Sequence, residues 1–181
     1  NQVGMVFQNP EAQLFCRSVE QEIVFGLESL GLSRRAIEDR LHNALDQAGI
    51  TALRQRDPQT LSGGEKHLVL IAAMLALRPR VIVLDEPFAN LDPANVHRVR
   101  RLLRELHAKG CGIVLCEHRL SRAAPDATRL VVIHEGKIAA DGAPHGILTL
   151  EGPLGWGNAL SIEIFGTEGP GQANGHDQLV V

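Results

Sequence analysis

The sequence predicts an α/β fold in which a parallel sheet is layered against helices. Short apolar runs, such as VIVL at residues 81–84, alternate with longer segments whose apolar residues recur at helical spacing. Alternation of this kind along a chain is typical of layered α/β cores. A purely helical pattern also fills residues 18–60, between the first predicted strand and the later ones. We therefore expect an α/β core that is interrupted by an inserted helical block.

The first half of the chain supplies one strand and then the helical block. The apolar run at residues 2–7 predicts a strand that ends at a loop marked by an Asn-Pro pair. Apolar residues then recur at helical spacing over residues 19–30, which predicts a first helix. Ser33 and Gly49 are of the types that cap the start and the end of a helix, so we expect a second helix between them.

The second half of the chain alternates helix and strand. Ser62 is expected to begin a helix whose apolar run reaches Leu77. The four large apolar residues at 81–84 then predict a parallel strand that is buried on both faces. Asp92, which is followed by a proline, is expected to cap the next helix. Further strands are expected at residues 112–116, 130–134 and 137–140.

The composition is that of one globular domain with a sizeable core, since the 181 residues are 44% hydrophobic and 22% charged. The net charge of -3 gives no electrostatic reason to expect a nucleic-acid partner. The three cysteines form no C-x-x-C pair and show no metal-ligand spacing, which favours a reduced, cytosolic chain. The longest apolar run, residues 68–77, has about half the length of a bilayer span, so a membrane role would require a partner.

The last residues of the chain have a different composition. Between about residues 166 and 177 the sequence contains Gly, Pro, Gln, Asn and His and almost no apolar side chains. Such a segment cannot bury enough apolar surface to order itself. We therefore predict a folded region at residues 1–160 and a flexible tail or linker at residues 161–181.

Two acidic residues follow the predicted strand at residues 81–84. Because ligands of α/β proteins bind at the carboxyl ends of the strands, Asp85 and Glu86 are candidates for a binding site. An apolar run followed by two acids is also common at the end of an ordinary strand that has no functional role. Pro87 and the NLD sequence that ends at Asp92 favour a functional site here.

The sequence LSGGE at residues 61–65 places a serine and two glycines at a predicted helix N-terminus. Ser62, Gly63 and Gly64 would leave backbone N–H groups and the positive end of the helix dipole facing outward. This arrangement predicts an anion site. A simple helix cap, with glycine for flexibility of the turn, is the alternative explanation.

Gln8 and His118 are expected at the same sheet edge as the two acids, because each follows a predicted strand. A glutamine alone is uninformative, and a lone histidine is more often structural than functional. Asp92 has two adequate explanations, since it can act as a helix N-cap as well as in a site. Gln8, His118 and Asp92 become candidate site residues only through the order in which all the motifs occur along the chain.

The order and spacing of these motifs resemble those of the ATP-binding-cassette (ABC) ATPases, which have a P-loop NTPase-like core. The resemblance implies ATP and Mg²⁺ as cofactors. It implies that Asp85 and Gln8 contact Mg²⁺ or its bound water, that Glu86 is the general base, and that His118 is the switch histidine. It also implies roles in trans: Ser62, Gly63, Gly64 and Glu65 would contact ATP held by another subunit, and Asp92 would lie in the loop that senses that subunit's site.

The sequence contains no G-x-x-x-x-G-K-[ST] loop, which cradles the nucleotide phosphates in this family. We therefore expect the C-terminal portion of a longer ABC ATPase domain, without the N-terminal part of its sheet. We also expect no Mg-ATP hydrolysis by these 181 residues alone. In the family, the strand that leads to the phosphate loop is expected beside the strand that ends at Asp85. Its loss would leave residues 81–84 at an unpaired sheet edge.

QNPEAQLF at residues 8–15 and VEQEIVFGLESLGL at residues 19–32 are similar to the ATPases of energy-coupling factor transporters, which import vitamins or transition-metal ions such as cobalt and nickel. The resemblance implies a head-to-tail pair with a second ABC ATPase subunit or domain, a transmembrane coupling protein and a substrate-binding membrane protein. It also implies a peripheral location on the cytoplasmic face of the cell membrane. Contacts with the coupling protein are expected at residues 9–15 and along the helix from Val19.

Two alternatives stay open. One is a non-catalytic ABC partner subunit that supplies only the LSGGE half-site, although such a subunit has no physical need of Glu86 and His118. The other is an ABC-type DNA-repair ATPase. Those proteins insert long coiled coils or zinc modules between the glutamine and the signature, whereas this chain has a short segment there and no metal-ligand cysteines.

Overall fold

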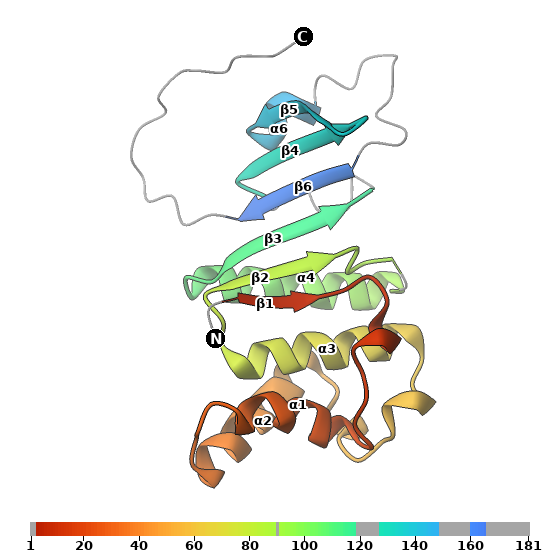
Figure 1. Ribbon diagram of the computed structural model, residues 1–181, viewed down its shortest axis with the longest axis vertical. Coiled ribbons are helices and arrows are strands. Elements are labelled where there is room, and N and C mark those ends of the chain that lie inside the picture. Colours follow the sequence, from red (N-terminus) through yellow and green to blue (C-terminus); the bar gives the residue numbers. More distant parts are fainter. Residues whose placement is uncertain (1–2, 90, 119–126, 149–159, 166–181) are drawn as a thin grey trace.

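The computed structural model describes residues 3–89, 91–118, 127–148 and 160–165, and within them the strands form a six-stranded mixed sheet (Figure 1). The strands are β1 (Val3–Val6), β2 (Val81–Asp85), β3 (Gly112–Glu117), β4 (Arg129–His134), β5 (Lys137–Gly142) and β6 (Leu160–Phe165). Their order is β1-β2-β3-β6-β4-β5. The first three strands run parallel, β6 runs antiparallel to β3 and β4, and β4 pairs antiparallel with β5. The predicted α/β class is confirmed.

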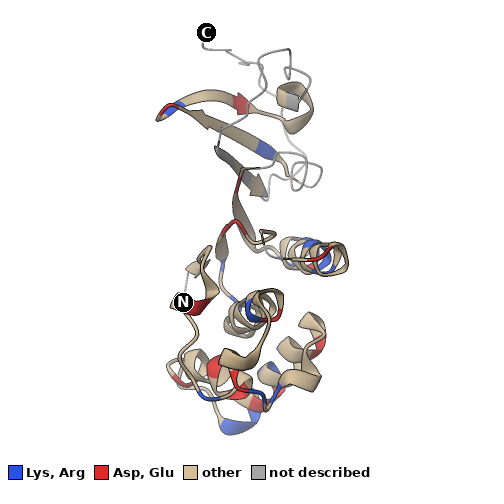
Figure 2. Ribbon diagram, turned by 90° about the vertical axis from the view of Figure 1, so that its right-hand side faces the viewer, with Lys and Arg blue, Asp and Glu red and all other residues tan. Residues whose placement is uncertain are grey.

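Helices lie on one side of the parallel strands and form a separate block beyond them (Figures 1 and 2). The helices are α1 (Val19–Glu28), α2 (Arg34–Ala48), α3 (Gly63–Leu77), α4 (Pro93–Ala108) and α6 (Pro144–Leu148), with 3-10 turns η1 (Pro10–Ala12), η2 (Thr51–Leu53) and η3 (Pro58–Thr60). α1 and α2 pack on α3, which contacts β1, and α4 contacts β3 and α2. In the described part of the chain, no helix combines the length and apolar character needed to span a membrane.

Local capping signals explain where the longer helices begin and end. The Ser33 hydroxyl accepts a hydrogen bond from the Ala36 N–H (3.3 Å), and α2 stops at Gly49, whose φ of 65° lies in the left-handed region that glycine adopts freely. Ser62 caps α3 and Asp92 caps α4 in the same way. These predicted boundaries are confirmed, because each depends on residues that are adjacent in the sequence.

The core lies between one face of the parallel strands and the helices α3 and α4. Strand side chains on this face are at most 2% exposed and belong to the same apolar cluster as the buried side of α3. Full burial of such a side chain contributes about 1.5–3 kcal/mol. The strand residues concerned are Val6, Ile82, Leu84, Ile113 and Leu115.

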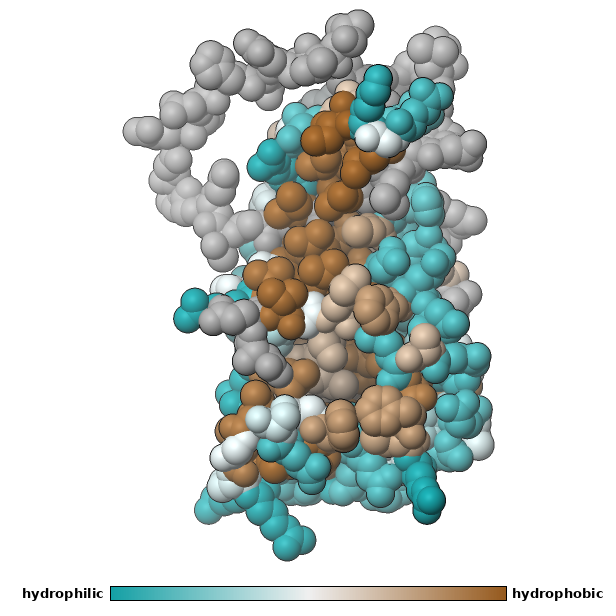
Figure 3. All heavy atoms as spheres, in the orientation of Figure 1, coloured by the Kyte–Doolittle hydropathy of each residue, from teal (hydrophilic) through white to brown (hydrophobic). Residues whose placement is uncertain are grey.

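The opposite face of the sheet is apolar as well, but no described helix covers it. Val3 and Met5 are 60% and 44% exposed, and their neighbours Val81 and Val83 are half-buried. Figure 3 shows the apolar side chains that gather along this face. The prediction that residues 81–84 are buried on both faces is therefore wrong, because α3 and α4 pack on one face only.

β2 lies inside the sheet, between β1 and β3, so the prediction of an unpaired edge at residues 81–84 is also wrong. The first strand of the chain pairs in parallel with β2 and forms the edge itself. Gln13 satisfies two backbone groups at the end of β1, since its Oε1 accepts from the Phe7 N–H (2.8 Å) and its Nε2 donates to the Met5 carbonyl (3.1 Å). Pairing of this kind protects an open strand edge.

The boundary predicted at residue 160 requires a correction. Residues 161–165, which were expected to belong to the flexible tail, are part of β6. The β6 sequence LSIEIF, residues 160–165, alternates apolar and polar residues with the period of a strand, and β6 pairs on both sides, with β3 and β4. Residues 166–181 lie outside the described residues, so the tail prediction there stays a prediction.

Candidate functional site

The carboxyl ends of the three parallel strands lie side by side at one edge of the sheet (Figure 1). The parallel register pairs Asp85 with Cys116. Gln8 follows β1, Glu86 follows β2 and His118 follows β3. The structure therefore places the four side chains that sequence analysis assigned to this edge on consecutive strands.

Glu86 and His118 are in direct contact across this edge. The His118 Nε2 lies 2.9 Å from Oε1 of Glu86, and the Glu86 side chain is largely buried whereas His118 is exposed. Glu86 has a φ of 46°, a left-handed conformation that costs a non-glycine residue about 1–2 kcal/mol. Its N–H donates to the Cys116 carbonyl (2.9 Å), which ties this turn to β3. Backbone strain of this kind is frequent at functional sites.

Glu117 is a buried carboxylate that sequence analysis did not single out. Its Oε1 accepts a hydrogen bond from the N–H of Phe88 (3.4 Å), and Phe88 itself is fully buried. The Ala89 N–H donates to the Glu86 carbonyl (3.1 Å) in the same turn. Glu117 thus fixes the turn that holds Glu86. The strand period contained the signal, because Glu117 falls in phase with the buried residues of β3.

The oxygen ligands at this edge fit Mg²⁺ only together with other ligands. Asp85 is half-buried and Gln8 is exposed. Among the described residues, no group of three or more His, Cys, Asp or Glu side chains is arranged to hold a metal. Burial, and then the charges of Asp85 and Glu117, raise the pKa of the Cys116 thiol at this edge. Mg²⁺ is commonly bound by one or two carboxylates plus water and substrate phosphates, so Asp85 and Gln8 are compatible with an ion that arrives with a nucleotide.

The LSGGE turn forms a complete capping box at the start of α3. Ser62 donates its N–H to Oε2 of Glu65 (2.8 Å), and the Ser62 hydroxyl accepts from the Glu65 N–H (3.3 Å). These hydrogen bonds from Ser62 hold the pKa of Glu65 below its usual value. The N–H groups of Gly63 and Gly64 have no acceptor among the described residues. An anion at this helix end would therefore meet the glycine N–H groups, while Glu65 serves the turn itself.

The contacts of Asp92 are those of an N-cap at the start of α4. Its Oδ1 accepts from the Asn95 N–H (2.9 Å), and its Oδ2 accepts from the Asn95 side-chain amide (2.8 Å). Its neighbour Asn90 lies outside the described residues. The role of Asp92 in sensing a second subunit stays a prediction.

The first turn of α3 is bound directly to the segment that follows Gln8. Lys66 is buried, and its Nζ lies 2.7 Å from the Glu11 carboxylate, which has its pKa lowered by this contact. His67 is fully buried, with Nδ1 3.1 Å from the Gly63 carbonyl, and burial lowers its pKa. Sequence analysis missed the ion pair because its partners are 55 positions apart. The ion pair connects the LSGGE turn at residues 61–65, here called the signature turn, to the segment that follows Gln8.

Glu22 holds the far end of the same segment. Its carboxylate is buried, and its Oε2 accepts from the N–H groups of Phe15 (3.1 Å) and Cys16 (2.8 Å). Phe15 packs edge-to-face on Phe25 of α1, with ring centroids 5.0 Å apart, yet both rings are more than half exposed. Two exposed aromatic rings in fixed geometry are typical of a protein contact surface.

Comparison with known proteins agrees with the fold. Residues 1–89 match the protein-family model described as ABC transporter. This chain belongs to the family of ABC transporter ATPases.

Individual relatives in this family are named for cobalt import and for energy-coupling factor transport. Cobalt import ATP-binding protein CbiO of Syntrophus aciditrophicus is 44% identical over 147 residues, which cover 81% of this chain and 52% of the relative. Energy-coupling factor transporter ATP-binding protein EcfA of Methanocaldococcus jannaschii is 40% identical over 142 residues, which cover 78% and 51%. The solved structure of cbiO1 from Clostridium perfringens, described as part of the ABC transporter complex cbiONQ, has a TM-score of 0.74 at 34% identity and covers 83% of this chain and 60% of its own. The chain spans about half the length of the curated relatives it matches.

Proposed function

We propose that this chain supplies the magnesium-binding, hydrolytic and signature elements of an ABC ATPase that powers an importer of the energy-coupling factor type. The observation that carries the proposal is the 2.9 Å contact between Glu86 and His118 at the carboxyl edge of the sheet. The names of the relatives, which refer to cobalt import and to energy-coupling factor transport, support the importer class. Since the sequence has no phosphate loop, the proposal requires a loop from outside these 181 residues.

Each residue of the sheet edge has its own task in this proposal. Glu86 orients the water that attacks the γ-phosphate and accepts its proton. His118 keeps the Glu86 carboxylate turned toward the edge through the contact at its Nε2. Asp85 and Gln8 would hold Mg²⁺, and the bound ion would neutralise phosphate charge.

The signature turn serves a different nucleotide from the one at the sheet edge. The glycine N–H groups and the positive end of the α3 dipole suit a phosphate that is presented by a second ABC ATPase subunit or domain, paired head to tail. Ser62, Gly63 and Gly64 would thus act in trans while Glu65 fixes the turn that presents them, and Asp92 would lie in the loop that contacts that partner. The ion pair between Lys66 and Glu11 would let each site respond to the other.

The exposed pair of Phe15 and Phe25 is the proposed contact for a transmembrane coupling protein. Phe25, on which Phe15 packs, lines a shallow groove together with Cys16, Arg17, Gln21, Val24 and Glu28. The ATPase would then sit peripherally on the cytoplasmic face of the cell membrane. A separate substrate-binding membrane protein would choose the cargo, which we place among vitamins and transition-metal ions.

Complementation with a phosphate loop tests the proposal. The 181-residue chain is produced together with the N-terminal part of a CbiO relative that carries the loop, and Mg-ATP hydrolysis is measured. We expect hydrolysis only when both chains are present, and its loss in Glu86→Gln. Turnover by the 181 residues alone that disappears in Glu86→Gln would contradict the need for an external loop.

The same experiment addresses the non-catalytic alternative, which the fully formed capping box at Ser62 keeps open. A subunit that supplies only this half-site would support hydrolysis by an intact ABC ATPase partner regardless of Glu86. Glu86→Gln would then have no effect, whereas Gly64→Val, which blocks the helix N-terminus, would abolish activity. The main proposal requires both substitutions to matter.

A further inference from the structure

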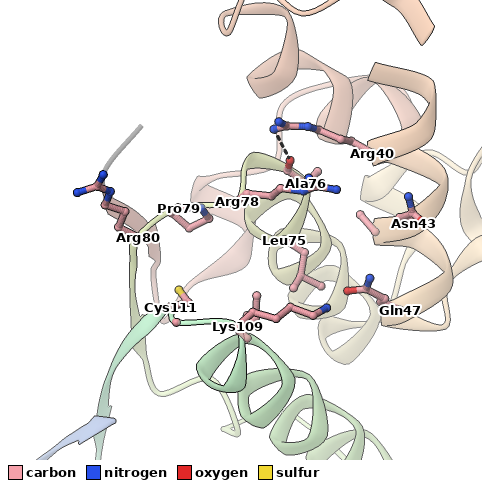
Figure 4. A pocket seen from close by; sticks show the side chains of 13 residues that line it. Arg40, Asn43, Gln47, Leu75, Ala76, Arg78, Pro79, Arg80, Lys109 and Cys111 are labelled. Carbon is pink, nitrogen blue, oxygen red and sulfur yellow. Dashed lines mark hydrogen bonds between the residues drawn. The ribbon is translucent and has the colours of Figure 1, made fainter. Parts of the chain in front are cut away.

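A second cavity lies at the opposite edge of the sheet from Glu86 and His118. It has a volume of about 440 Å³ and is enclosed by α2, by the C-terminal end of α3 and by the turn after α4 (Figure 4). Arg80, which precedes β2, and Cys111, which precedes β3, belong to its lining, so it faces the amino ends of the strands. The volume is within the usual range for small-molecule sites. The pocket shares no residue with the sheet edge or the signature turn.

The lining of this pocket is basic and contains no acidic side chain. Its cations come from α2, from the end of α3 and from the turn after α4, and two amides accompany them. In Figure 4 Arg40 and Arg78 lie together near Ala76, Lys109 lies beside Gln47, and Arg80 is directed away from them. The charged and amide residues are Arg40, Arg78, Arg80, Lys109, Asn43 and Gln47.

The helix ends nearby do not cancel this positive charge. The C-termini of α3 and α4 are each equivalent to about half a negative charge. The charges of Arg40, Arg78 and Lys109 outweigh them. Nη1 of Arg40 donates to the Ala76 carbonyl (3.3 Å), which orients the guanidinium and leaves most of its five N–H groups for another acceptor. A pocket with this charge in a protein of net charge -3 favours an anionic occupant.

Arg78 supplies an independent observation, because its backbone is strained. It ends α3 in the left-handed conformation, with a φ of 52°. α2 ends in the same conformation on Gly49, where glycine removes the strain. An arginine at such a position costs about 1–2 kcal/mol relative to an unstrained conformation. Strain of this kind is frequent where a side chain clamps a ligand.

We propose that this pocket binds a small phosphate-bearing anion. The planar guanidinium groups of Arg40 and Arg78 match the paired oxygens of a phosphate, and Lys109 adds a third positive charge from another element. Asn43 and Gln47 offer further donors at the pocket wall. The site is separate from the proposed nucleotide edge and does not depend on the proposed function.

Titration of the full chain with inorganic pyrophosphate tests the proposal. Amide shifts of the ¹⁵N-labelled protein are followed at constant ionic strength, with sodium chloride as the reference salt. We expect saturable shifts that cluster at Ala76–Arg80 and at Lys109–Cys111, and none with chloride. Shifts spread over the surface, or equal shifts with chloride, would overturn the proposal.

Substitutions separate binding from folding. Arg78→Gly removes the guanidinium and relieves the backbone strain, so this variant should fold at least as well as the parent and bind pyrophosphate at least about tenfold more weakly. Lys109→Gln should weaken binding as well, whereas Arg35→Gln, at an exposed position on the same helix as Arg40, should not. Unchanged affinity in both Arg78→Gly and Lys109→Gln would refute the site.

Vesicles that contain phosphatidylglycerol distinguish a lipid headgroup from a free anion. Binding to these vesicles without saturable binding of pyrophosphate would also refute the proposal.

Discussion

Replacement of Glu22 by alanine is expected to release the segment that carries Phe15. The carboxylate is buried and accepts the N–H groups of Phe15 and Cys16 at 3.1 and 2.8 Å. A hydrogen bond to a charged group contributes about 1.5–3 kcal/mol, and a buried N–H left without an acceptor is penalised by about 1–3 kcal/mol. Because Phe15 is exposed, water can replace part of the loss at its N–H. We expect Glu22→Ala to lower the free energy of unfolding by about 2–4 kcal/mol.

The isosteric change Glu22→Gln separates charge from shape. Glutamine keeps one oxygen acceptor and loses the negative charge, so we expect a loss of about 1 kcal/mol. Urea unfolding measures both variants, and hydrogen exchange at the Phe15 and Cys16 amides reports the local effect. Glu28→Ala, on the exposed side of the same helix, is the control and should change stability by less than about 0.5 kcal/mol. Stability of Glu22→Ala within that margin, with unchanged exchange at both amides, would refute the reasoning.

Three further predictions concern the nucleotide edge, the signature turn and its buried histidine. In the complemented ATPase, Glu86→Gln should lower kcat at least about 100-fold while a fluorescent nucleotide still binds, and an unchanged kcat would exclude Glu86 as the base. Burial lowers the pKa of His67, so the unfolded chain binds a proton more readily and the free energy of unfolding should fall as the pH drops below about 6.5. His67→Gln should flatten this part of the pH profile in urea titrations, and an equally steep profile would contradict the assignment. Ser62→Ala removes the capping hydroxyl and should lower the free energy of unfolding by about 0.5–2 kcal/mol, whereas Ser62→Thr should retain most of it; equal losses in the two variants would rule out the cap as the cause.

Local signals made much of the fold predictable from the sequence. The cap at Ser33, the glycine stop at Gly49 and the LSGGE turn act between neighbouring residues, so the ends of α2 and the start of α3 follow from sequence. The carboxyl-edge position of Asp85 and Glu86 followed from strand direction alone. The end of α3 near Leu77 was predicted from the apolar run, but the left-handed conformation of the arginine that follows was not, because that conformation normally requires glycine.

The features that the sequence did not predict depend on which elements pack together in the folded chain. The prediction that β2 is buried on both faces was wrong, because burial depends on which elements pack against a strand. The composition of the strand does not reveal those elements. β6 was missed because the Gly-rich composition after it obscured a short alternating run. The contact of Lys66 with Glu11 joins positions 55 apart, and no local pattern indicates such a pair. Glu22 and Glu117 look like surface acids in the sequence, yet both satisfy backbone N–H groups inside the protein.

α3 connects the signature turn with the basic pocket. The helix has 15 residues and is therefore about 22 Å long, with the signature turn at one end and Arg78 at the other. Its middle is packed on all sides, since residues 66–73 are buried, so a local bend would disturb many contacts and the two ends are rigidly connected. A tilt of about 10° around its centre would displace each end by roughly 2 Å. If the signature turn meets a neighbour's phosphate as proposed, a tilt that brings it closer would also move Arg78, at the edge of the basic pocket, by a similar distance.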